Sequence, residues 1–416
     1  MAKSFIIMVN LYIFNESSRA AVYGIGTYIK ELTSALKDSG INVCIVHLRS
    51  NKPDEELAES DDIRHLYIPP PINRNTSLDW NSQSELYYRN VVYLLRLQIE
   101  ETSRLVFHLN YNQNGKLADE LKKTFACKVI ATVHYSNWGF IVFDNLQRLR
   151  NILSAEQPDT LGVNLLKSFE EEKVFYSKAN HIICLSKYMQ DILCRDYKLP
   201  PSKITVIPNG LSDGFDKVTG VQFLRKKWNV PVREKIILFA GRMDEVKGLA
   251  YLLKAFREVL LSYPQSRLVI AGNGAYDKYT KESQNICTRI TYTGMLDKPQ
   301  LYEWYRMANV GVTPSLFEPF GYVAVEMMMH GLTVVTTATS GLNEVVDESC
   351  GIKVPLTVLP DSVEIETSLL AQKIVYLLQH PAEARRRGRN GRKRYLKEYA
   401  SEVFRRNMLQ LYKSLN

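Results

Sequence analysis

Two glutamates, Glu318 and Glu326, lie eight positions apart in a segment that also contains Pro319 and Gly321. Pro319 is typical of the first turn of a helix, where its missing N–H costs nothing, and Gly321 leaves the neighbouring amides open to a ligand. Carboxylates at this spacing on one helix are about 12 Å apart along its axis. One could bind a sugar and the other a ribose, with a pyrophosphate between them over the helix N-terminus. A capping role is the alternative for Glu318, but it leaves the rest of the segment unexplained.

A second pair of candidate residues, Arg242 and Lys247, follows an expected strand at residues 236–240. Gly241 at the strand end lets the backbone approach a ligand, and Lys247 stands where the next helix is expected to begin. Two fixed cations at a helix N-terminus would suit a diphosphate. The alternative is that both are ordinary surface cations on a loop.

The elements that must position these residues alternate between short β-rich runs and longer helical stretches. Continuous apolar strands separated by helices are typical of parallel sheets that are covered on both faces. The expected strands are residues 5–12, 43–48, 105–109, 129–134, 182–185, 205–207, 236–240, 267–271, 290–293, 310–313 and 333–336. The expected helices are residues 26–38, 249–262, 299–307 and 320–330.

This alternation predicts an α/β protein with two Rossmann-like, doubly wound domains that face each other across a cleft. We expect domains at residues 1–215 and 216–395, and a C-terminal helix at 396–416 that packs back toward the first domain. The polar stretch around residues 208–220 is interpreted as a linker, and residues 69–81 as an irregular insertion. In such sheets, ligands bind beyond the carboxyl ends of the strands.

Composition excludes several classes of protein. The chain has 416 residues, 45% hydrophobic and 23% charged, which is ordinary for a globular protein of two or three domains. No apolar run approaches the roughly 18 residues of a membrane-spanning helix, and the run at residues 5–9 is too short for a signal peptide. We therefore expect a cytoplasmic protein.

The six cysteines lie far apart in the sequence and several stand inside apolar stretches, which is typical of reduced, buried thiols. No cluster of histidines and cysteines has metal-ligand spacing, and no DxD motif is present, so no metal site is predicted.

The positive charge is concentrated in one run. With 53 Lys and Arg against 44 Asp and Glu, the net charge is +9. Seven of those charges fall within ten residues, so a nucleic-acid-binding surface is not indicated. The run is either a solvated helix face or a contact for anions, which would be lipid headgroups on the inner face of a membrane or an anionic acceptor. Its members are Arg385, Arg386, Arg387, Arg389, Arg392, Lys393 and Arg394.

The order and spacing of these motifs resemble the retaining glycosyltransferases of family 4, which have the GT-B fold. The resemblance runs through most of the chain, although residues 50–104 contain no recognised motif. Besides Arg242 and Lys247 and the segment from Glu318 to Glu326, it rests on further short motifs. These are residues 24–32 (Gly-Ile-Gly-Thr-Tyr-Ile-Lys-Glu-Leu), His134, Ser186, residues 208–210 (Pro-Asn-Gly), residues 272–274 (Gly-Asn-Gly), Gly294 and residues 341–346 (Gly-Leu-Asn-Glu-Val-Val).

The resemblance implies an enzyme, typical of bacterial glycan biosynthesis, that moves a sugar from a nucleotide-diphosphate sugar such as a UDP- or GDP-sugar to a hydroxyl acceptor. It implies no cofactor, an acceptor-side first domain and a donor-binding second domain. The implied catalytic residues are His134, Glu318, Arg242 and Lys247. The implied donor-binding residues are Gly24, Gly241, Met295, Phe320, Gly321, Tyr322 and Glu326.

The sequence departs from the family pattern at three residues, one of which is Gly26, where the family commonly has a charged residue. Tyr23 stands before Gly24 where the family usually has a second glycine, and Ser340 replaces the first glycine of the usual Gly-Gly before residues 341–346. The donor sugar, its base and the acceptor, which could be a glycan, a lipid-linked saccharide, a peptide or a small molecule, are not identified by these motifs.

Two other functions are considered. An NAD-dependent oxidoreductase would use Gly24 and Gly26, but Ile29 replaces the third glycine and no acid ends the second strand. A non-catalytic binder of sugar nucleotides or polyanions would use the basic run. Tight binding of NAD without nucleotide-sugar binding would favour the first, and transfer or hydrolysis of a donor would exclude the second.

Overall fold

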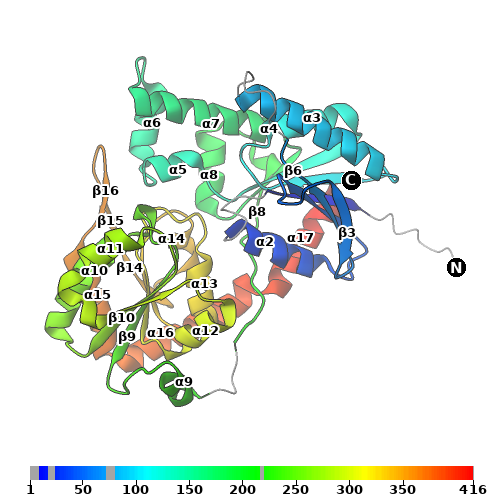
Figure 1. The fold of residues 1–416 in the computed structure, drawn as a ribbon. Coiled ribbons are helices and arrows are strands. Elements are labelled where there is room, and N and C mark those ends of the chain that lie inside the picture. The colour runs from blue at the N-terminus through cyan, green and yellow to red at the C-terminus, as the bar shows by residue number, and fades with distance from the viewer. Residues whose placement is uncertain (1–8, 17–23, 72–79, 216–219, 416) are drawn as a thin grey trace. The chain divides into compact units, whose positions relative to one another are not determined.

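The computed structural model describes residues 9–16, 24–71, 80–215 and 220–415, and it divides into two compact units. The first unit comprises Met1–Ser136, Pro158–Gly210 and Ser401–Asn416, and the second comprises Asn137–Gln157 and Leu211–Ala400. Residues 137–157, which lie within the expected first domain, therefore belong to the second unit. Residues 401–416 belong to the first (Figure 1).

The first unit is built on an eight-stranded sheet with the order β3-β4-β2-β1-β5-β6-β7-β8. Every neighbouring pair is parallel except β3 and β4. Its strands are β1 (Asn10–Glu16), β2 (Asn42–Leu48), β3 (Glu56–Ser60), β4 (Ile63–Ile68), β5 (Leu105–Leu109), β6 (Cys127–Val133), β7 (His181–Cys184) and β8 (Ile204–Val206). Its helices are α2 (Gly24–Leu36), α3 (Trp80–Gln98), α4 (Gly115–Thr124), α7 (Thr160–Lys178), α8 (Lys187–Arg195), η1 (Pro201–Lys203) and α17 (Ser401–Ser414).

The second unit is built on a six-stranded parallel sheet with the order β11-β10-β9-β12-β13-β14, and a two-stranded hairpin accompanies it. Its strands are β9 (Lys235–Ala240), β10 (Ser266–Ala271), β11 (Ile290–Gly294), β12 (Val310–Thr313), β13 (Val334–Thr337), β14 (Gly351–Val354), β15 (Leu356–Val358) and β16 (Val363–Ile365). Its helices are α5 (Asn137–Ile141), α6 (Leu146–Ser154), α9 (Val221–Lys227), η2 (Glu245–Lys247), α10 (Leu249–Ser262), α11 (Tyr276–Glu282), η3 (Gln284–Arg289), α12 (Lys298–Met307), α13 (Tyr322–Met329), α14 (Leu342–Val345), α15 (Thr367–Gln379), α16 (Pro381–Arg394) and η4 (Tyr395–Tyr399).

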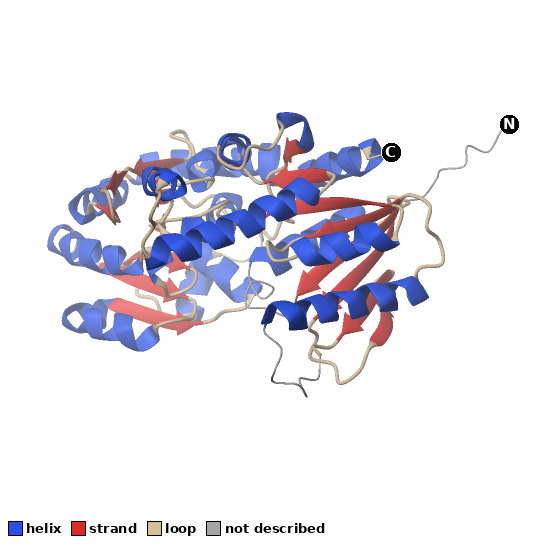
Figure 2. Cartoon of the chain, turned by 90° about the horizontal axis from the view of Figure 1, so that it is seen from above, coloured by secondary structure: helices blue, strands red, loops and turns tan. Residues whose placement is uncertain are grey.

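The prediction of two parallel sheets covered by helices is confirmed, and Figure 2 shows the strands of each sheet between helices. The apolar strands are buried because helices cover both faces of each sheet. All five residues of β5 are buried, for example. In the first unit, α17 packs against α2 through a cluster that includes Phe404, Met408 and Tyr28.

Strand order places the candidate sites. In each sheet the direction of winding reverses once, between β1 and β5 in the first unit and between β9 and β12 in the second. At such a point the loops after the two strands diverge and leave a crevice at the carboxyl edge of the sheet. The loop after β9 begins with Gly241 and Arg242, and the loop after β12 leads to Glu318.

Several expected elements are shifted by one or two residues, and two differ for reasons that matter to the fold or the site. The first strand was expected to end shortly after Asn10, but it begins there. The polar Asn10 side chain is satisfied at this position, because its N–H donates to the Ser103 carbonyl at 3.0 Å and its oxygen accepts from the Asn42 side chain at 3.0 Å. Residues 5–8 of the expected strand lie outside the described residues. The helix expected at residues 320–330 begins only at Tyr322, for reasons that lie in the site.

Candidate active site

The loops after β9, β10 and β11 meet backbone to backbone. The Gly272 N–H donates to the Gly294 carbonyl at 2.9 Å, and the Gly241 N–H donates to the Ala271 carbonyl at 2.9 Å. Gly272 has φ +152°, and a Cβ there would collide with the Gly241 carbonyl oxygen. Residues larger than glycine are therefore excluded at Gly272, and glycine backbone without side chains lines the carboxyl edge of the sheet.

Asp244 links the two cations that follow Gly241. One of its oxygens pairs with the Arg242 guanidinium at 3.1 Å, and the other accepts from the Lys247 N–H at 3.2 Å. Gly248, at φ +68°, ends the short turn η2, and a Cβ there would collide with the Pro314 carbonyl oxygen. Arg242 and Lys247 are thus held on one tight loop, and Gly248 at the end of this loop packs against Pro314, which directly follows β12.

Lys247 forms an ion pair with Glu318. Both side chains are about one-fifth exposed, at 21% and 19%, so the pair is shielded but open to a ligand. The structure therefore brings together two of the predicted catalytic residues, although they lie 71 positions apart in the sequence. A diphosphate entering here would compete with the Glu318 carboxylate for the Lys247 ammonium.

The loop from Glu318 to Gly321 is not helical, which corrects the expectation for Pro319. The Glu318 N–H donates to the Ser340 hydroxyl at 3.1 Å, and the Glu318 carbonyl accepts from the Leu342 N–H at 3.1 Å. Gly321 has φ +101° and precedes the first helical residue of α13, so Pro319 lies outside the first turn. The two glutamates therefore do not share one helix, and Glu318 is held by a loop.

Residues 137–157 contribute to holding this loop. One carboxylate oxygen of Asp144 accepts from the Ser340 N–H at 3.1 Å, and the Ser340 hydroxyl in turn accepts from the Glu318 N–H. Gly139 lies so close to Phe317 that a Cβ would collide with its ring. Ser340, which departs from the family pattern, thus supplies a hydroxyl contact that a glycine could not make.

Glu326 is almost completely buried on α13, with 1% of its surface exposed. One of its oxygens accepts from the Tyr305 hydroxyl at 2.9 Å, and the other pairs with Lys298, whose side chain is half exposed. Burial and the Glu326 carboxylate together raise the pKa of Tyr305 well above its usual value, so this hydroxyl remains a donor. A ribose would reach Glu326 only by displacing the Lys298 ammonium.

The other predicted donor-binding residues of this unit lie around the same edge. Phe320 is buried edge-on between the rings of Tyr322 and Tyr399, with ring centroids 5.3 and 5.8 Å away, which makes its side chain structural. Met295 is exposed beyond β11, and its sulfur contacts the Asn273 amide at 3.7 Å. Met295 is therefore accessible, and its contact with a base stays a prediction.

His134 and Gly24 belong to the first unit and lie at or beyond its secondary-structure ends. His134 directly follows β6 and is 8% exposed, whereas Gly24 begins α2 and is exposed. Tyr23, the residue that departs from the family pattern, lies outside the described residues.

Asn110 fixes the protonation of His134. The Asn110 amide N–H donates to the Phe14 carbonyl at 3.1 Å, which turns its oxygen toward His134 Nε2 at 3.1 Å. Nε2 must then carry the proton, and Nδ1 is the acceptor. Burial, with a smaller contribution from His108, lowers the pKa of His134 to about 3, so the ring is neutral at pH 7. His134 can therefore accept a hydrogen bond from a sugar hydroxyl.

Beneath His134 lies a fully buried histidine. His108 contacts the Tyr412 hydroxyl at 2.7 Å and the Thr132 hydroxyl at 2.6 Å, and Tyr28 contacts Thr132 at 3.3 Å. Burial lowers the pKa of His108 to about 3. This network joins α2, β5, β6 and α17, and it holds the neutral form of His108.

The His108 network predicts a loss of stability in mild acid. Because the pKa of His108 is lower in the folded than in the unfolded chain, unfolding takes up a proton as the pH falls below about 6.5. The loss should reach roughly 2 kcal/mol for this histidine at pH 5. Urea unfolding at pH 7 and 5 should show a smaller pH dependence in His108→Gln than in the unmodified protein. His380→Gln, which removes an exposed histidine, should leave the dependence unchanged, and an equal dependence in His108→Gln would contradict the assignment.

Several site residues were not identified from the sequence. Asn110, Asp144, Lys298 and Tyr305 act through another side chain, and nothing in the local sequence marks such a role. Asn110 alone had a usable signal, because it directly follows β5 at the point where the first sheet reverses its winding.

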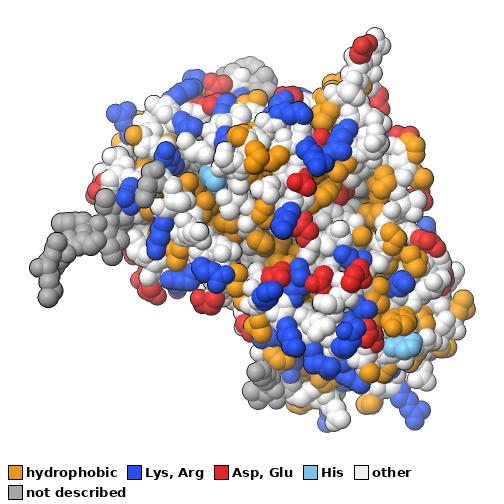
Figure 3. All heavy atoms as spheres, turned by 180° about the vertical axis from the view of Figure 1, so that it is seen from behind, with side chains coloured by type: hydrophobic (Ala, Val, Ile, Leu, Met, Phe, Trp, Pro, Cys, Tyr) orange, Lys and Arg blue, Asp and Glu red, His pale blue; other side chains and the backbone are white. Residues whose placement is uncertain are grey.

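The basic run of α16 is largely engaged within the second unit. Arg387 contacts Glu383 and the Gly351 carbonyl, Arg392 pairs with Asp213, and Arg394 pairs with Asp347 at 2.6 Å. Figure 3 shows Lys and Arg side chains interspersed with Asp and Glu side chains on the face that it draws. The run therefore presents less free charge than its composition suggests. In the described part of the chain, no helix is long and apolar enough to cross a membrane.

Comparison with known proteins identifies the family. A family model described as Glycosyltransferase Family 4 matches residues 22–214, and one described as Glycosyl transferases group 1 matches residues 221–394. An uncharacterised glycosyltransferase of Methanocaldococcus jannaschii is 32% identical over 267 residues, which are 53% of this chain and 68% of that protein.

Solved structures agree in fold. Sucrose-phosphate synthase from Thermosynechococcus elongatus superposes with a TM-score of 0.77 at 25% identity, over 98% of this chain and 99% of that one. Anabaena HepE, solved in complex with UDP-glucose, gives a TM-score of 0.69 at 15% identity over 98% and 100%. The chain therefore belongs to glycosyltransferase family 4, whose members have the GT-B fold and transfer a sugar from a nucleotide sugar with retention.

Proposed function

We propose that the crevice of the second unit binds a nucleoside-diphosphate sugar through a diphosphate clamp formed by Arg242 and Lys247. The observation that carries the proposal is the Lys247–Glu318 ion pair at the point where the sheet reverses its winding. As the glycosidic bond breaks, the leaving diphosphate gains negative charge, and fixed cations stabilise that charge. Lys247, released from Glu318 by the incoming phosphate, is the cation best placed to do so.

The two glutamates have separate roles in this proposal. Glu318, freed from Lys247, contacts hydroxyls of the donor sugar, while Glu326 binds the ribose after Lys298 has moved away. The amides that follow Glu318, near Gly321, serve the phosphates or the sugar at the start of α13. Met295 lies against the base. UDP is the first nucleotide to test, because Anabaena HepE was solved with UDP-glucose.

The leaving phosphate, rather than an enzyme carboxylate beneath the anomeric carbon, is proposed to take the acceptor proton. A covalent glycosyl-enzyme intermediate would need a carboxylate at the reacting carbon, and no residue of the predicted site fills that role. The neutral His134 contributes a hydrogen-bond acceptor for a hydroxyl of the donor or acceptor, and it does not supply a positive charge.

The first unit is proposed to hold the acceptor. It contains a groove of about 870 Å³, within the range of small-molecule sites. Arg49, which follows β2, and Asn112, which follows β5, line it at the carboxyl edge of the sheet, and the exposed Gln113 beside Asn112 offers an amide to sugar hydroxyls. Asn112 is fixed from below by the buried Glu172 at 2.8 Å.

Peripheral contact with an anionic membrane stays a proposal. It rests on Arg385, Arg389 and Lys393, since the other cations of the run contact acidic groups or carbonyls of the second unit.

Thermal-shift screening of UDP, GDP, their sugars and NADH tests the donor site. A matching nucleotide sugar at 100 times its dissociation constant should stabilise the protein by about 2.7 kcal/mol, and NADH should not. Stabilisation by NADH alone would overturn the proposal. With the donor identified, Gln113→Ala should raise the KM for the acceptor and leave donor hydrolysis in water unchanged, whereas an unchanged acceptor KM would remove the acceptor from this groove.

A further inference from the structure

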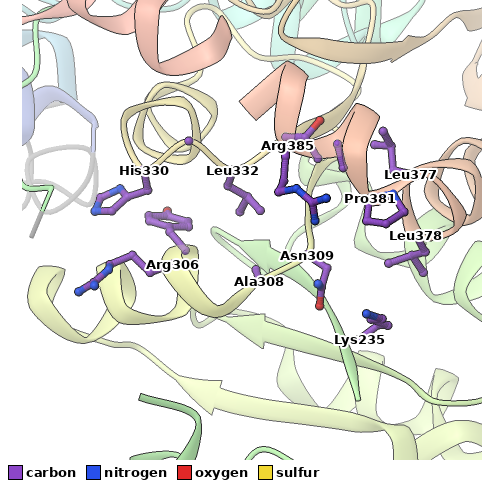
Figure 4. Close-up of a pocket in the computed structure, with 14 residues that line it drawn as sticks. Lys235, Arg306, Ala308, Asn309, His330, Leu332, Leu377, Leu378, Pro381 and Arg385 are labelled. Atoms are coloured by element: carbon purple, nitrogen blue, oxygen red, sulfur yellow. The ribbon is translucent and has the colours of Figure 1, made fainter. Parts of the chain in front are cut away.

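A second pocket of the second unit lies at the opposite edge of its sheet from Arg242 and Glu318. We call it the amino-end pocket because Lys235 is the first residue of β9, Asn309 directly precedes β12 and Thr333 directly precedes β13 (Figure 4). Its volume is about 240 Å³, below the range of about 300–1,000 Å³ that is usual for sites of drug-sized ligands. A small ion or group therefore suits it better than a nucleotide sugar does.

The amino-end pocket is positively charged. Lys235, Arg306 and Arg385 line it, and none of the described residues that line it is acidic. Among the described residues, neither Lys235 nor Arg385 has an ion-pair partner. In Figure 4, Arg385 reaches toward Asn309, and Lys235 lies on the other side of Asn309. The two cations thus converge on one end of the pocket.

A helix N-terminus adds to this charge. The 14-residue α16 begins at Pro381, which lines the pocket together with Ala384 and Arg385. Its N-cap residue, His380, makes no side-chain cap, so the first amides are not covered by it. The positive end of a helix dipole favours an anion at this position.

Two buried polar atoms of the pocket lack a partner in the described structure. The Thr333 hydroxyl is on a residue that is 2% exposed, and His330 Nε2 is on a residue that is 7% exposed. A buried hydroxyl without a hydrogen bond is unfavourable, and in native proteins nearly all such groups are satisfied. A ligand in the pocket would supply the missing partner for Thr333.

We propose that the amino-end pocket binds a phosphate group, with Arg385 and Lys235 as cations and the Thr333 hydroxyl as a donor. The site is separate from the proposed donor site, and two elements link them: α13, and Tyr305 of α12, which lines the pocket and donates to Glu326 at 2.9 Å. His330 lines the pocket and its Nδ1 donates to the carbonyl of Glu326 at 2.8 Å, so the ligand would lie at the far end of the helix that carries Glu326.

Calorimetric titration with inorganic phosphate, at an ionic strength held constant with chloride, tests the site. Saturable binding is expected in the unmodified protein. Arg385→Gln and Lys235→Gln should each weaken it by about 10- to 100-fold, the size of a lost hydrogen bond to a charged group. Arg389→Gln is the matched control: it removes an exposed cation of the same helix that does not line the pocket, and it should leave the affinity unchanged.

Thr333→Val separates binding from structure. Replacing an unsatisfied buried hydroxyl by a methyl group of similar shape should leave the unliganded protein equally or more stable to heat, while phosphate binding weakens. Lower stability with unchanged phosphate affinity would show that the hydroxyl serves the fold and would overturn its role in the site.

Arg242→Ala identifies where the phosphate binds. Phosphate affinity that falls in Arg242→Ala and persists in Arg385→Gln would place the ion in the donor site and overturn the proposal. Absence of phosphate binding in the unmodified protein, or an equal loss in Arg389→Gln, would also overturn it. A failure of this kind would leave the nucleotide-sugar proposal intact, because that proposal depends on UDP or GDP binding at the other edge of the sheet.

Vesicles distinguish the source of the phosphate group. If phosphatidylglycerol vesicles bind, compete with inorganic phosphate and lose binding in Arg385→Gln while phosphatidylcholine vesicles do not bind, then a lipid headgroup is the ligand. If inorganic phosphate binds and neither vesicle does, then a soluble phosphate is the ligand. Either result supports a phosphate site.

Discussion

Replacing Lys247 by methionine is expected to weaken the binding of the donor and of the free nucleoside diphosphate by about 2–5 kcal/mol, the cost of truncating one partner of a shielded charge pair. The reason is twofold. The variant loses the cation that meets the diphosphate, and it leaves the Glu318 carboxylate unpaired beside an incoming anion. Arg242→Ala should act in the same direction but less strongly. Its partner Asp244 would not be left unpaired, because Asp244 still accepts a hydrogen bond from the Lys247 N–H.

The measurement is calorimetry with the nucleoside diphosphate, and the chain offers a matched control. Lys278 pairs with Glu245 at 2.7 Å, also in the second unit, but both side chains are exposed. Lys278→Met should therefore change the nucleotide affinity little. If Lys247→Met and Lys278→Met weaken binding equally, the effect is one of overall charge and the clamp does not exist.

The pattern of strands and glycines was sufficient to predict much of this arrangement. The bounds of the strand at residues 105–109, the helix at 249–262 and the strand at 310–313 agree with β5, α10 and β12. These segments are strongly apolar or strongly periodic, so the local sequence determines them. Because ligands bind beyond the carboxyl ends of parallel strands, the sequence also indicated which loops carry the candidate residues, those after residues 236–240 and 310–313.

The errors have a common physical origin in contacts between residues distant in sequence. Glu318 is held out of the helix by Ser340 and Leu342, more than twenty positions away, and Pro319 could not reveal them. Glu326 is covered by Lys298 and Tyr305 from α12. The basic run was interpreted as a solvated helix face or a contact for anions, and the sequence did not indicate that Arg392 and Arg394 pair with the distant Asp213 and Asp347.

The C-terminal part of the chain shows the same limit. A helix was expected at residues 396–416, and the structure has a π-helical turn at Tyr395–Tyr399 followed by α17. The break falls at Ala400, which forms an isolated bridge with Leu211. Nothing within residues 396–416 indicates that bridge, because its partner residue, Leu211, lies almost two hundred positions earlier.

The two glutamates should respond to substitution in opposite ways. In Glu318→Gln, Lys247 loses a competitor and is free to meet the diphosphate, so the affinity for free nucleoside diphosphate should be retained or increased. The donor sugar, whose ring changes shape and charge as its bond breaks, loses a carboxylate contact that strengthens in the transition state. The value of kcat should therefore fall by about 100-fold, which is comparable to removing one well-placed charged hydrogen bond.

Glu326→Gln should do the reverse. The ribose is bound alike before and during the reaction. Removing its contact should therefore weaken donor binding by about 1.5–3 kcal/mol, which raises KM and leaves kcat nearly intact. Part of this loss should be recovered because Lys298 no longer has to be displaced from a charged partner, and in Lys298→Met the donor should bind at least as well as before. Steady-state kinetics and nucleotide calorimetry on the three variants separate these outcomes. If Glu318→Gln abolishes nucleotide binding while Glu326→Gln lowers only kcat, the donor lies in the opposite direction along α13, and the ribose meets the loop rather than the helix.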